Sequence, residues 1–177
     1  MKVIADLHVH SRYSRATSKK MNVQEITRFA QIKGLNLVGT GDFTHPRWLK
    51  ELNEDLVEVP GSGLYKPARD IKSPVQYIIT SEVSTIFTFD GQVKKIHHVL
   101  LTPSLETAVQ VNERLARHGP LTVDGRPVLD VTAPQLVEEV MEVSGENVVI
   151  PAHAWTPWFS IFGAFSGFDR VEDCYQD

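Results

Sequence analysis

The sequence predicts an α/β fold in a single domain over residues 1–177, built from short apolar strands that alternate with amphipathic helices. Two observations support this prediction. Apolar runs of strand length recur along the 177 residues, and helix start signals stand between them. Strands separated by helices favour a parallel sheet or an α/β barrel, and both place their chemistry at the carboxyl ends of the strands.

The first half of the chain begins with an apolar run and continues with a marked helix start. Asn22 followed by Glu25 is typical of a capping box, and Gly34 is a fitting helix stop. Prolines and glycines in the later part predict a loop. The expected elements are a strand at 3–7, a helix at 22–34, a strand at 35–39, a helix at 46–56 and a loop at 57–74.

The second half is predicted to contain a β-hairpin. Asp90-Gly91 separates two runs rich in β-branched and aromatic residues, and Asp-Gly is a strong two-residue hairpin signal. Ser104 and Thr132 are typical N-caps, the latter with Gln135 three residues on. The expected elements are strands at 75–89 and 93–101, helices at 105–118 and 132–143, and a strand at 147–151; residues 155–168 match no pattern.

The composition excludes several classes of protein. A net charge of -4 and a pI of about 6.0 exclude a globally basic nucleic-acid coat. The single cysteine, Cys174, excludes a disulfide framework and a cysteine zinc site, and no histidine near it in sequence supports a nucleophilic role. With no signal-peptide layout and no apolar run of roughly 20 residues, the chain is expected in the cytoplasm and not in a membrane.

Side chains that bind metals follow the apolar runs. A lone His-x-His is weak evidence, but five segments repeat the same order of an apolar run and then a ligand-type residue. Imidazole and carboxylate suit Zn, Mn or Fe, and metals held a few Å apart can activate water for phosphoryl transfer. The pattern therefore predicts a multi-metal site; its candidates are His8, His10, Asp42, His45, Glu82, His97, His98 and His153.

The stretch Ala5-Asp6-Leu7-His8-Val9-His10-Ser11 resembles the polymerase and histidinol phosphatase (PHP) family. This resemblance implies a distorted (β/α)7 TIM-like barrel with a trinuclear metal site that hydrolyses phosphoesters. Residues 10–20, 39–48 and 96–106 resemble most closely the endonuclease Q enzymes of that family. That closer resemblance implies nicking of DNA on the 5′ side of deaminated bases such as uracil and hypoxanthine, or at abasic sites.

Site roles follow from the resemblance by position. It implies two or three divalent ions, zinc first and Mn, Mg or Fe as alternatives. Asp42 and Glu82 are expected to be catalytic. Asp42 is either a ligand or a group that orients a ligand histidine. The implied ligands are His8, His10, Asp42, Glu82, His153 and one of the pair His97 and His98.

The sequence also departs from the family pattern. Phe43 stands where the family has a histidine, which makes His45 a candidate substitute, and Thr17 stands where the wider family has an acid or a histidine. The family's last motif, Asp-x-His, does not occur after His153. We therefore expect a barrel that is incomplete at its C-terminal end, with an exposed edge through which chains could self-associate.

Two further features allow a functional and a structural interpretation. Residues 11–20 carry Arg12, Arg15, Lys19 and Lys20 and no acid, which suits contacts to DNA phosphates or a solvated loop. Tyr13 could stack on a base or simply pack. Six aromatic residues could stack on an extruded base or pack against the barrel; they are Trp155, Trp158, Phe159, Phe162, Phe165 and Phe168.

Metal-dependent phosphodiester hydrolysis on DNA that contains deaminated bases is the function these features favour. One alternative is a small-molecule phosphatase of the same family. The other is a degenerate, non-catalytic fragment that binds metal or nucleic acid. Ser11 and Ser14 lack a nucleophile-elbow context, so serine hydrolysis is rejected.

Overall fold

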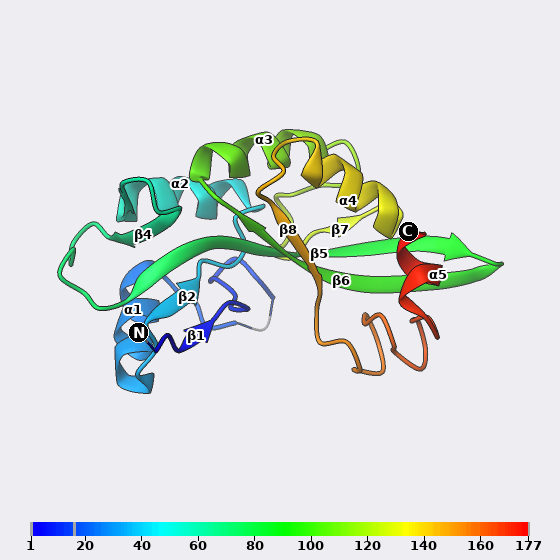
Figure 1. Cartoon of the computed structure of the whole chain (residues 1–177), viewed down its shortest axis with the longest axis horizontal. Coiled ribbons are helices and arrows are strands. Elements are labelled where there is room, and N and C mark those ends of the chain that lie inside the picture. Colours follow the sequence, from blue (N-terminus) through cyan, green and yellow to red (C-terminus); the bar gives the residue numbers. More distant parts are fainter. Residues whose placement is uncertain (1, 16, 177) are drawn as a thin grey trace.

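A long antiparallel hairpin, formed by β5 (Gln76–Phe89) and β6 (Gln92–Thr102), runs through the length of the molecule (Figure 1). The computed structural model describes residues 2–15 and 17–176. The predicted hairpin is confirmed, and Asp90 and Gly91 at its tip have φ of 47° and 72°. Positive φ at both central residues is what a type I′ turn requires.

The sheet is mixed and open. Over the described residues it has eight strands and the chain has five helices. β1 (Ala5–Asp6), β2 (Leu37–Gly39) and the first part of β5 are parallel, as expected. β6 is antiparallel to both β5 and β8 (Val148–Pro151), so the sheet as a whole is not parallel.

The predicted barrel, which was expected to be incomplete at its C-terminal end, is not observed. Among the described residues, β1 pairs only with β2, and β8 pairs only with β6. Two sheet edges therefore remain open where a barrel would join them. The α/β class is correct, and the closure that the resemblance implied is not.

The first two helices follow their sequence signals. In α1 (Val23–Lys33), the Asn22 side chain accepts the Glu25 N–H, and Gly34 ends the helix at φ 73°. The Glu25 carboxylate accepts a hydrogen bond from Arg28 at 2.9 Å, so Asn22 caps without the reciprocal half of a capping box. α2 (Pro46–Asp55) begins with the proline, as is common for a residue that lacks a backbone donor.

The loop expected at 57–74 contains two strands. β3 (Leu56–Val59) and β4 (Leu64–Pro67) form an antiparallel pair, and Tyr65 joins it to β5 opposite Tyr77. Pro60, Gly61 and Gly63 lie in the turn between the two strands, and Pro67 is the last residue of β4. Tertiary pairing with β5 overrides the local signal.

The later elements agree more closely with expectation. α3 (Leu105–Leu115) starts at the Ser104 cap, and α4 (Ala133–Met141) starts at a complete capping box of Thr132 and Gln135. Figure 1 shows α2, α3 and α4 on one side of the hairpin and α1 on the other. Two short elements carry too little pattern to be predicted, β7 (Val128–Leu129) and α5 (Val171–Tyr175). Within the described residues, no helix is both long and apolar enough to cross a membrane.

Candidate metal centre

The carboxylate of Glu82 lies at the centre of four histidine rings. Glu82 is buried in β5, and each ring directs one nitrogen at its oxygens. The distances to Glu82 are 3.3 Å from His8 Nε2, 3.2 Å from His10 Nε2, 3.1 Å from His97 Nδ1 and 3.1 Å from His153 Nε2. Four sequence segments far apart in the chain thus meet at one carboxylate.

The five cluster residues do not all lie just after a strand, as the pattern of apolar run and ligand suggests. His8 and His10 follow β1, and His153 follows β8, as predicted. Glu82 and His97 instead lie inside their strands. Each follows a short apolar run, but both lie within the strands expected at 75–89 and 93–101, which the structure confirms as β5 and β6.

Strand register separates His97 from His98. Ser84 pairs with His97, so His97 shares a face with Glu82, two residues before Ser84. His98 faces the other side, where its ring contacts Thr85 Oγ1 at 3.0 Å and the Tyr175 hydroxyl at 3.0 Å. Burial lowers the pKa of His98 to about 3, so its ring is neutral and takes no part in the Glu82 cluster.

Asp42 orients His10 from behind. Its Oδ1 is 2.9 Å from His10 Nδ1, and its Oδ2 accepts two hydrogen bonds of 2.7 Å from the backbone N–H and hydroxyl of Ser11. Asp42 has a φ of 51° and follows Gly41, where a Cβ would meet the Val9 carbonyl oxygen at 2.2 Å. The glycine is thus required for the close approach that brings Asp42 under His10.

His153 is oriented in a similar way. Its Nδ1 lies 3.0 Å from Thr156 Oγ1, and that hydroxyl donates to the Trp158 carbonyl at 2.9 Å. Because the hydroxyl hydrogen is used there, Thr156 accepts from His153 Nδ1–H. The Nε2 lone pair of the neutral ring is then directed at Glu82.

These hydrogen bonds provide a test of whether the cluster fits a metal. Nδ1 of both His10 and His153 donates to a fixed acceptor, so in the neutral rings the Nε2 lone pairs face a carboxylate. Acceptor facing acceptor at just over 3 Å is unfavourable unless a cation lies between them or a ring takes up a second proton. The donor set of neutral imidazoles and one carboxylate fits a transition metal.

The pKa shifts agree with a site that favours cations. Burial acts to lower the pKa of His10, but hydrogen bonds to Asp42 and Glu82 outweigh it and raise the value to about 9. Burial acts to raise the pKa of Glu82, and hydrogen bonds from His10, His8 and His97 hold it well below its usual range. Burial also lowers the pKa of His97 despite its contact with Glu82, which keeps that ring neutral.

Two ligand groups share Glu82. Among the described residues, His8, His10 and Glu82 form one group, and Glu82, His97 and His153 form the other, with the ligand atoms of each group within 4.8 Å of one another. A carboxylate common to both groups is in the position of a bridging ligand. The geometry therefore suits two neighbouring ions.

Other predicted ligands lie outside these groups. His45 stands at the N-cap of α2, and its ring lies 4.4 Å from the Tyr13 ring. One face of Tyr13 is therefore packed against His45. The Thr17 hydroxyl donates to the Ser11 and Ser14 carbonyls at 2.7 Å and so holds the loop between them. Asp42 contacts His10, a proposed ligand, and is absent from both groups.

The basic loop is partly neutralised. Arg12 forms an ion pair with Glu51 at 2.6 Å, and the exposed Arg15 forms one with Asp124 at 3.3 Å. Lys19 and Lys20 are exposed. The loop lies beside the cluster because it follows His10 directly.

Sequence reasoning missed Arg126, whose Nη1 is 3.2 Å from Glu82 Oε2. Arg126 follows no apolar run and belongs to the segment before β7, so no pattern in the sequence marked it. With Arg15, His97 and Phe159 it lines a pocket of about 340 Å³ beside the cluster. The pocket wall therefore carries two guanidinium groups next to the proposed ligands.

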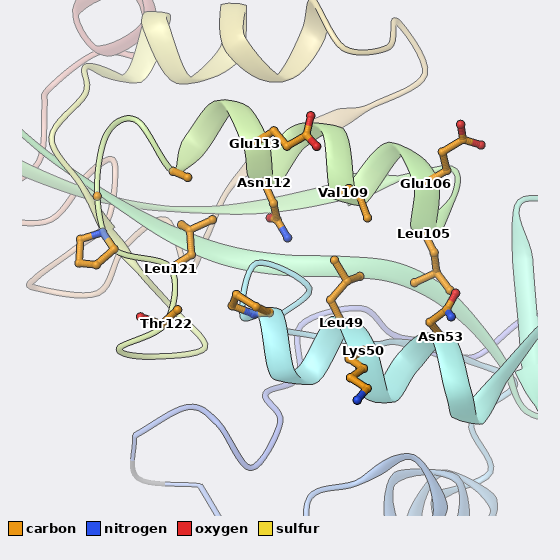
Figure 2. A pocket seen from close by; sticks show the side chains of 14 residues that line it. Leu49, Lys50, Asn53, Leu105, Glu106, Val109, Asn112, Glu113, Leu121 and Thr122 are labelled. Atoms are coloured by element: carbon orange, nitrogen blue, oxygen red, sulfur yellow. The ribbon is translucent and has the colours of Figure 1, made fainter.

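A larger cavity of about 840 Å³ lies elsewhere, between α2 and α3 (Figure 2). Leu49, Leu105 and Val109 point into it, with Lys50 and Glu106 at its rim. None of the Glu82 cluster residues lines it. Lys50, Glu106 and Glu113 are among its lining residues, but no histidine is.

Comparisons with known proteins add an independent observation. No family model matches the chain. It is 32% identical over 169 residues to an uncharacterized protein of Methanocaldococcus jannaschii, a match that covers 95% of this chain and 18% of that protein. The chain therefore spans about a fifth of the length of this curated relative.

Solved structures are also similar. The lesion-specific endonuclease PfuEndoQ from Pyrococcus furiosus matches with a TM-score of 0.81 and 34% identity, over 99% of this chain and 40% of that one. Endonuclease Q in complex with a 27-mer duplex substrate that has an abasic lesion at the active site matches with a TM-score of 0.80 and 34% identity, over 98% and 40%. The fold is thus shared with part of a DNA endonuclease.

Proposed function

We propose that this chain carries the metal-dependent phosphodiesterase site of a DNA repair endonuclease, as a PHP-type domain that nicks 5′ of deaminated bases (uracil, hypoxanthine) or at abasic sites. One observation carries the proposal: four histidines converge on buried Glu82 in a chain 34% identical to a lesion-specific endonuclease over 99% of its length. The proposed substrate is DNA with a damaged base.

The proposed ion ligands are the two groups that share Glu82. His8 and His10 would hold one divalent ion with Glu82, and His97 and His153 would hold the other. Zinc is the first candidate, and Mn, Fe or Mg are alternatives for such nitrogen and oxygen donors. When bound, the ions would supply water activation and neutralisation of phosphoryl charge.

The remaining residues of the site position these groups and bind the phosphate. Asp42 and Thr156 fix the rings of His10 and His153. Arg126, at the inner wall of the 340 Å³ pocket, is placed to donate to a phosphodiester oxygen beside the cluster, and Arg15 lies at the same pocket. Lys19 and Lys20 would contact the DNA backbone farther out.

The test is cleavage of labelled duplexes that contain one uracil, one hypoxanthine or one abasic site, with an undamaged duplex as control. We expect cleavage 5′ of the lesion only, abolished by a chelator and restored by added zinc or manganese. Glu82→Gln should abolish cleavage. Cleavage of the undamaged duplex at the same rate would contradict the lesion-specific proposal.

A small-molecule phosphatase is the second candidate, because the pocket of about 340 Å³ beside the cluster has the size of a small-ligand site. A generic phosphomonoester in the same assay separates the two. Hydrolysis of the monoester alone would exclude the endonuclease. Metal binding without hydrolysis of either substrate would favour the degenerate binding fragment.

Self-association through the sheet edge is also part of the proposal. β8 presents an edge that is unpaired among the described residues, and Val148 and Ile150 on this strand are exposed. An unpaired strand with apolar side chains is a template for pairing with another chain. Sedimentation at increasing concentration tests this; a single monomeric species throughout would exclude it.

A further inference from the structure

The segment that follows β8 exposes large aromatic side chains next to the metal centre. Trp155, Trp158 and Phe165 are 80%, 52% and 64% exposed. We refer to these three residues as the aromatic platform. Single exposed apolar residues are common, but three large exposed aromatic rings within eleven residues of sequence are unusual and indicate a binding role.

The exposure does not result from a lack of packing in this segment. Ile161 and Phe168, from the same segment, are buried against β6 and α4 residues in a small core. Two backbone hydrogen bonds of 3.0 Å, Lys95 N–H to Ser166 and His97 N–H to Phe159, tie the segment to the edge of β6. The chain thus holds the platform outward in a fixed backbone.

The platform is arranged in stacked pairs with a cation beside it. The rings of Trp158 and Phe165 stack with centroids 4.7 Å apart, and those of Trp155 and Phe162 with centroids 5.9 Å apart. The Lys95 ammonium lies 5.9 Å from the Trp158 ring centroid. Flat exposed rings beside a cation match the two parts of a nucleotide, its base and its phosphate.

Short links connect the platform to the cluster. Thr156, which orients His153, donates to the backbone carbonyl of Trp158 at 2.9 Å. The next residue, Phe159, has its ring 4.5 Å from the ring of His97 and also lines the pocket that contains Arg126. A strand with a phosphate at the cluster could therefore place a neighbouring base on the platform.

We propose that the aromatic platform stacks unpaired bases of a DNA strand beside the metal centre. This inference rests on the proposed function and adds to it a preference for unpaired over paired DNA, because only unpaired bases offer free faces for stacking. The alternative occupant, the platform of a second copy, would bring a second Lys95 instead of the anion that a nucleotide phosphate offers. It is made an outcome of the test.

The experiment measures binding of a 15-nucleotide single-stranded oligodeoxythymidine and of a 15-base-pair duplex in a chelator, so that no hydrolysis occurs. Tryptophan emission reports on the platform, since Trp48 is fully buried and gives a constant background. We expect quenching by the single strand. Trp158→Leu and Phe165→Leu should each weaken its binding by about 5- to 150-fold, the worth of one stacked base, and affect the duplex much less.

Two variants serve as controls. Trp158→Phe keeps a flat ring and should retain most of the affinity. Phe29→Leu removes another exposed aromatic residue with its own cation, Arg28 at 4.3 Å, but on α1, at the opposite end of the molecule in Figure 1, and should change nothing. Native circular dichroism of both leucine variants establishes that they fold.

Equal single-strand affinity of wild type, Trp158→Leu and Phe165→Leu would overturn the inference. So would concentration-dependent dimerisation that Trp158→Leu abolishes, which would assign the platform to a second copy. If the wild type cleaves lesion DNA and the leucine variants bind single strands normally, only the platform proposal is refuted. If the wild type stacks single strands but does not cleave lesion DNA, only the proposed function is refuted.

Discussion

Asp42 Oδ1 lies 2.9 Å from His10 Nδ1, and this contact determines which nitrogen of His10 is free to bind a cation. The other oxygen of Asp42 is held by two donors of Ser11, so the carboxylate cannot rotate away. The result is a chain of contacts from Ser11 through Asp42 and His10 to Glu82. Ser11 and Asp42 thereby determine which nitrogen of His10 faces Glu82.

Replacement of Asp42 by asparagine should therefore weaken metal binding without removing a ligand. The Ser11 donors require an oxygen, so the amide NH₂ would face His10 Nδ1 and favour the tautomer with hydrogen on Nε2. We expect zinc affinity to fall about 10- to 100-fold, measured by competition with a chelating dye. Asp130→Asn, at an exposed carboxylate, is the control, and equal affinities of the two variants would contradict the orienting role.

The close approach at Gly41 beneath His10 can be tested by substitution, with Gly61 as the matched control. Both have positive φ, 64° and 68°, but a Cβ at Gly41 would lie 2.2 Å from the Val9 carbonyl oxygen, whereas Gly61 has open space. Gly61→Ala should cost about 1–2 kcal/mol of unfolding free energy, from backbone strain alone. Gly41→Ala should cost about 3 kcal/mol or more. Urea unfolding in a chelator measures both, and equal losses would argue against the steric requirement.

Stability should depend on pH through His98. Its pKa is lowered from 6.5 to about 3 by burial, so between these values the unfolded chain binds a proton that the folded chain does not. This contribution to stability is complete above pH 6.5 and is lost as pH falls, by up to about 1.4 kcal/mol per pH unit. Urea unfolding of metal-free protein from pH 7 to 4 should show a shallower pH dependence for His98→Gln than for wild type.

His118→Gln is the control for that measurement. His118 follows α3 and contacts Glu139 on α4, away from Thr85 and Tyr175, which contact His98. His118→Gln also removes a hydrogen bond that lowers the pKa of the partly exposed Glu139, so its effect should be small and should leave the loss of stability due to His98 in place. Parallel curves for wild type and His98→Gln would show that His98 is not held neutral in the folded protein.

Removal of Arg126 should reduce the number of phosphate contacts by one. For duplex DNA, the slope of log affinity against log salt should become shallower by about 0.9 for Arg126→Ala. Fluorescence anisotropy in a chelator measures the slope. Arg170→Ala removes an exposed arginine paired with Glu172 and should leave it unchanged. Loss of affinity at constant slope would mean that Arg126 acts through Glu82 alone.

Local signals predicted most of the elements but not the way in which they associate. The caps at Asn22, Ser104 and Thr132 and the turn at Asp90-Gly91 depend on neighbouring residues, and all are present. β3 and β4 depend on pairing with β5, and no short stretch of sequence contains that information. Sheet closure is likewise a property of distant edges.

The candidate site also has a part that local sequence signals predicted and a part that depends on distant pairing. The order of apolar run and ligand identified His8, His10, Glu82, His97 and His153, which the structure brings together, although their ligand roles remain a prediction. The order could not distinguish His97 from His98, because only the register with β5 determines which face each occupies. Arg126 reaches Glu82 from an irregular segment, where periodicity carries no information.

The type I′ turn at Asp90-Gly91 also constrains how the length of the gene could have changed. Deletion of one codon on either side of the tip would shift Ser84 from His97 to a neighbour and turn one proposed ligand away from Glu82. Loss of one residue from each strand would keep that pairing but change the type of pair that closes the turn. Insertions and deletions in descendants of this sequence should therefore be rare in the hairpin. Those that occur should change both strands by the same number of residues, two on each, so that the pairing and the type of closing pair are both kept.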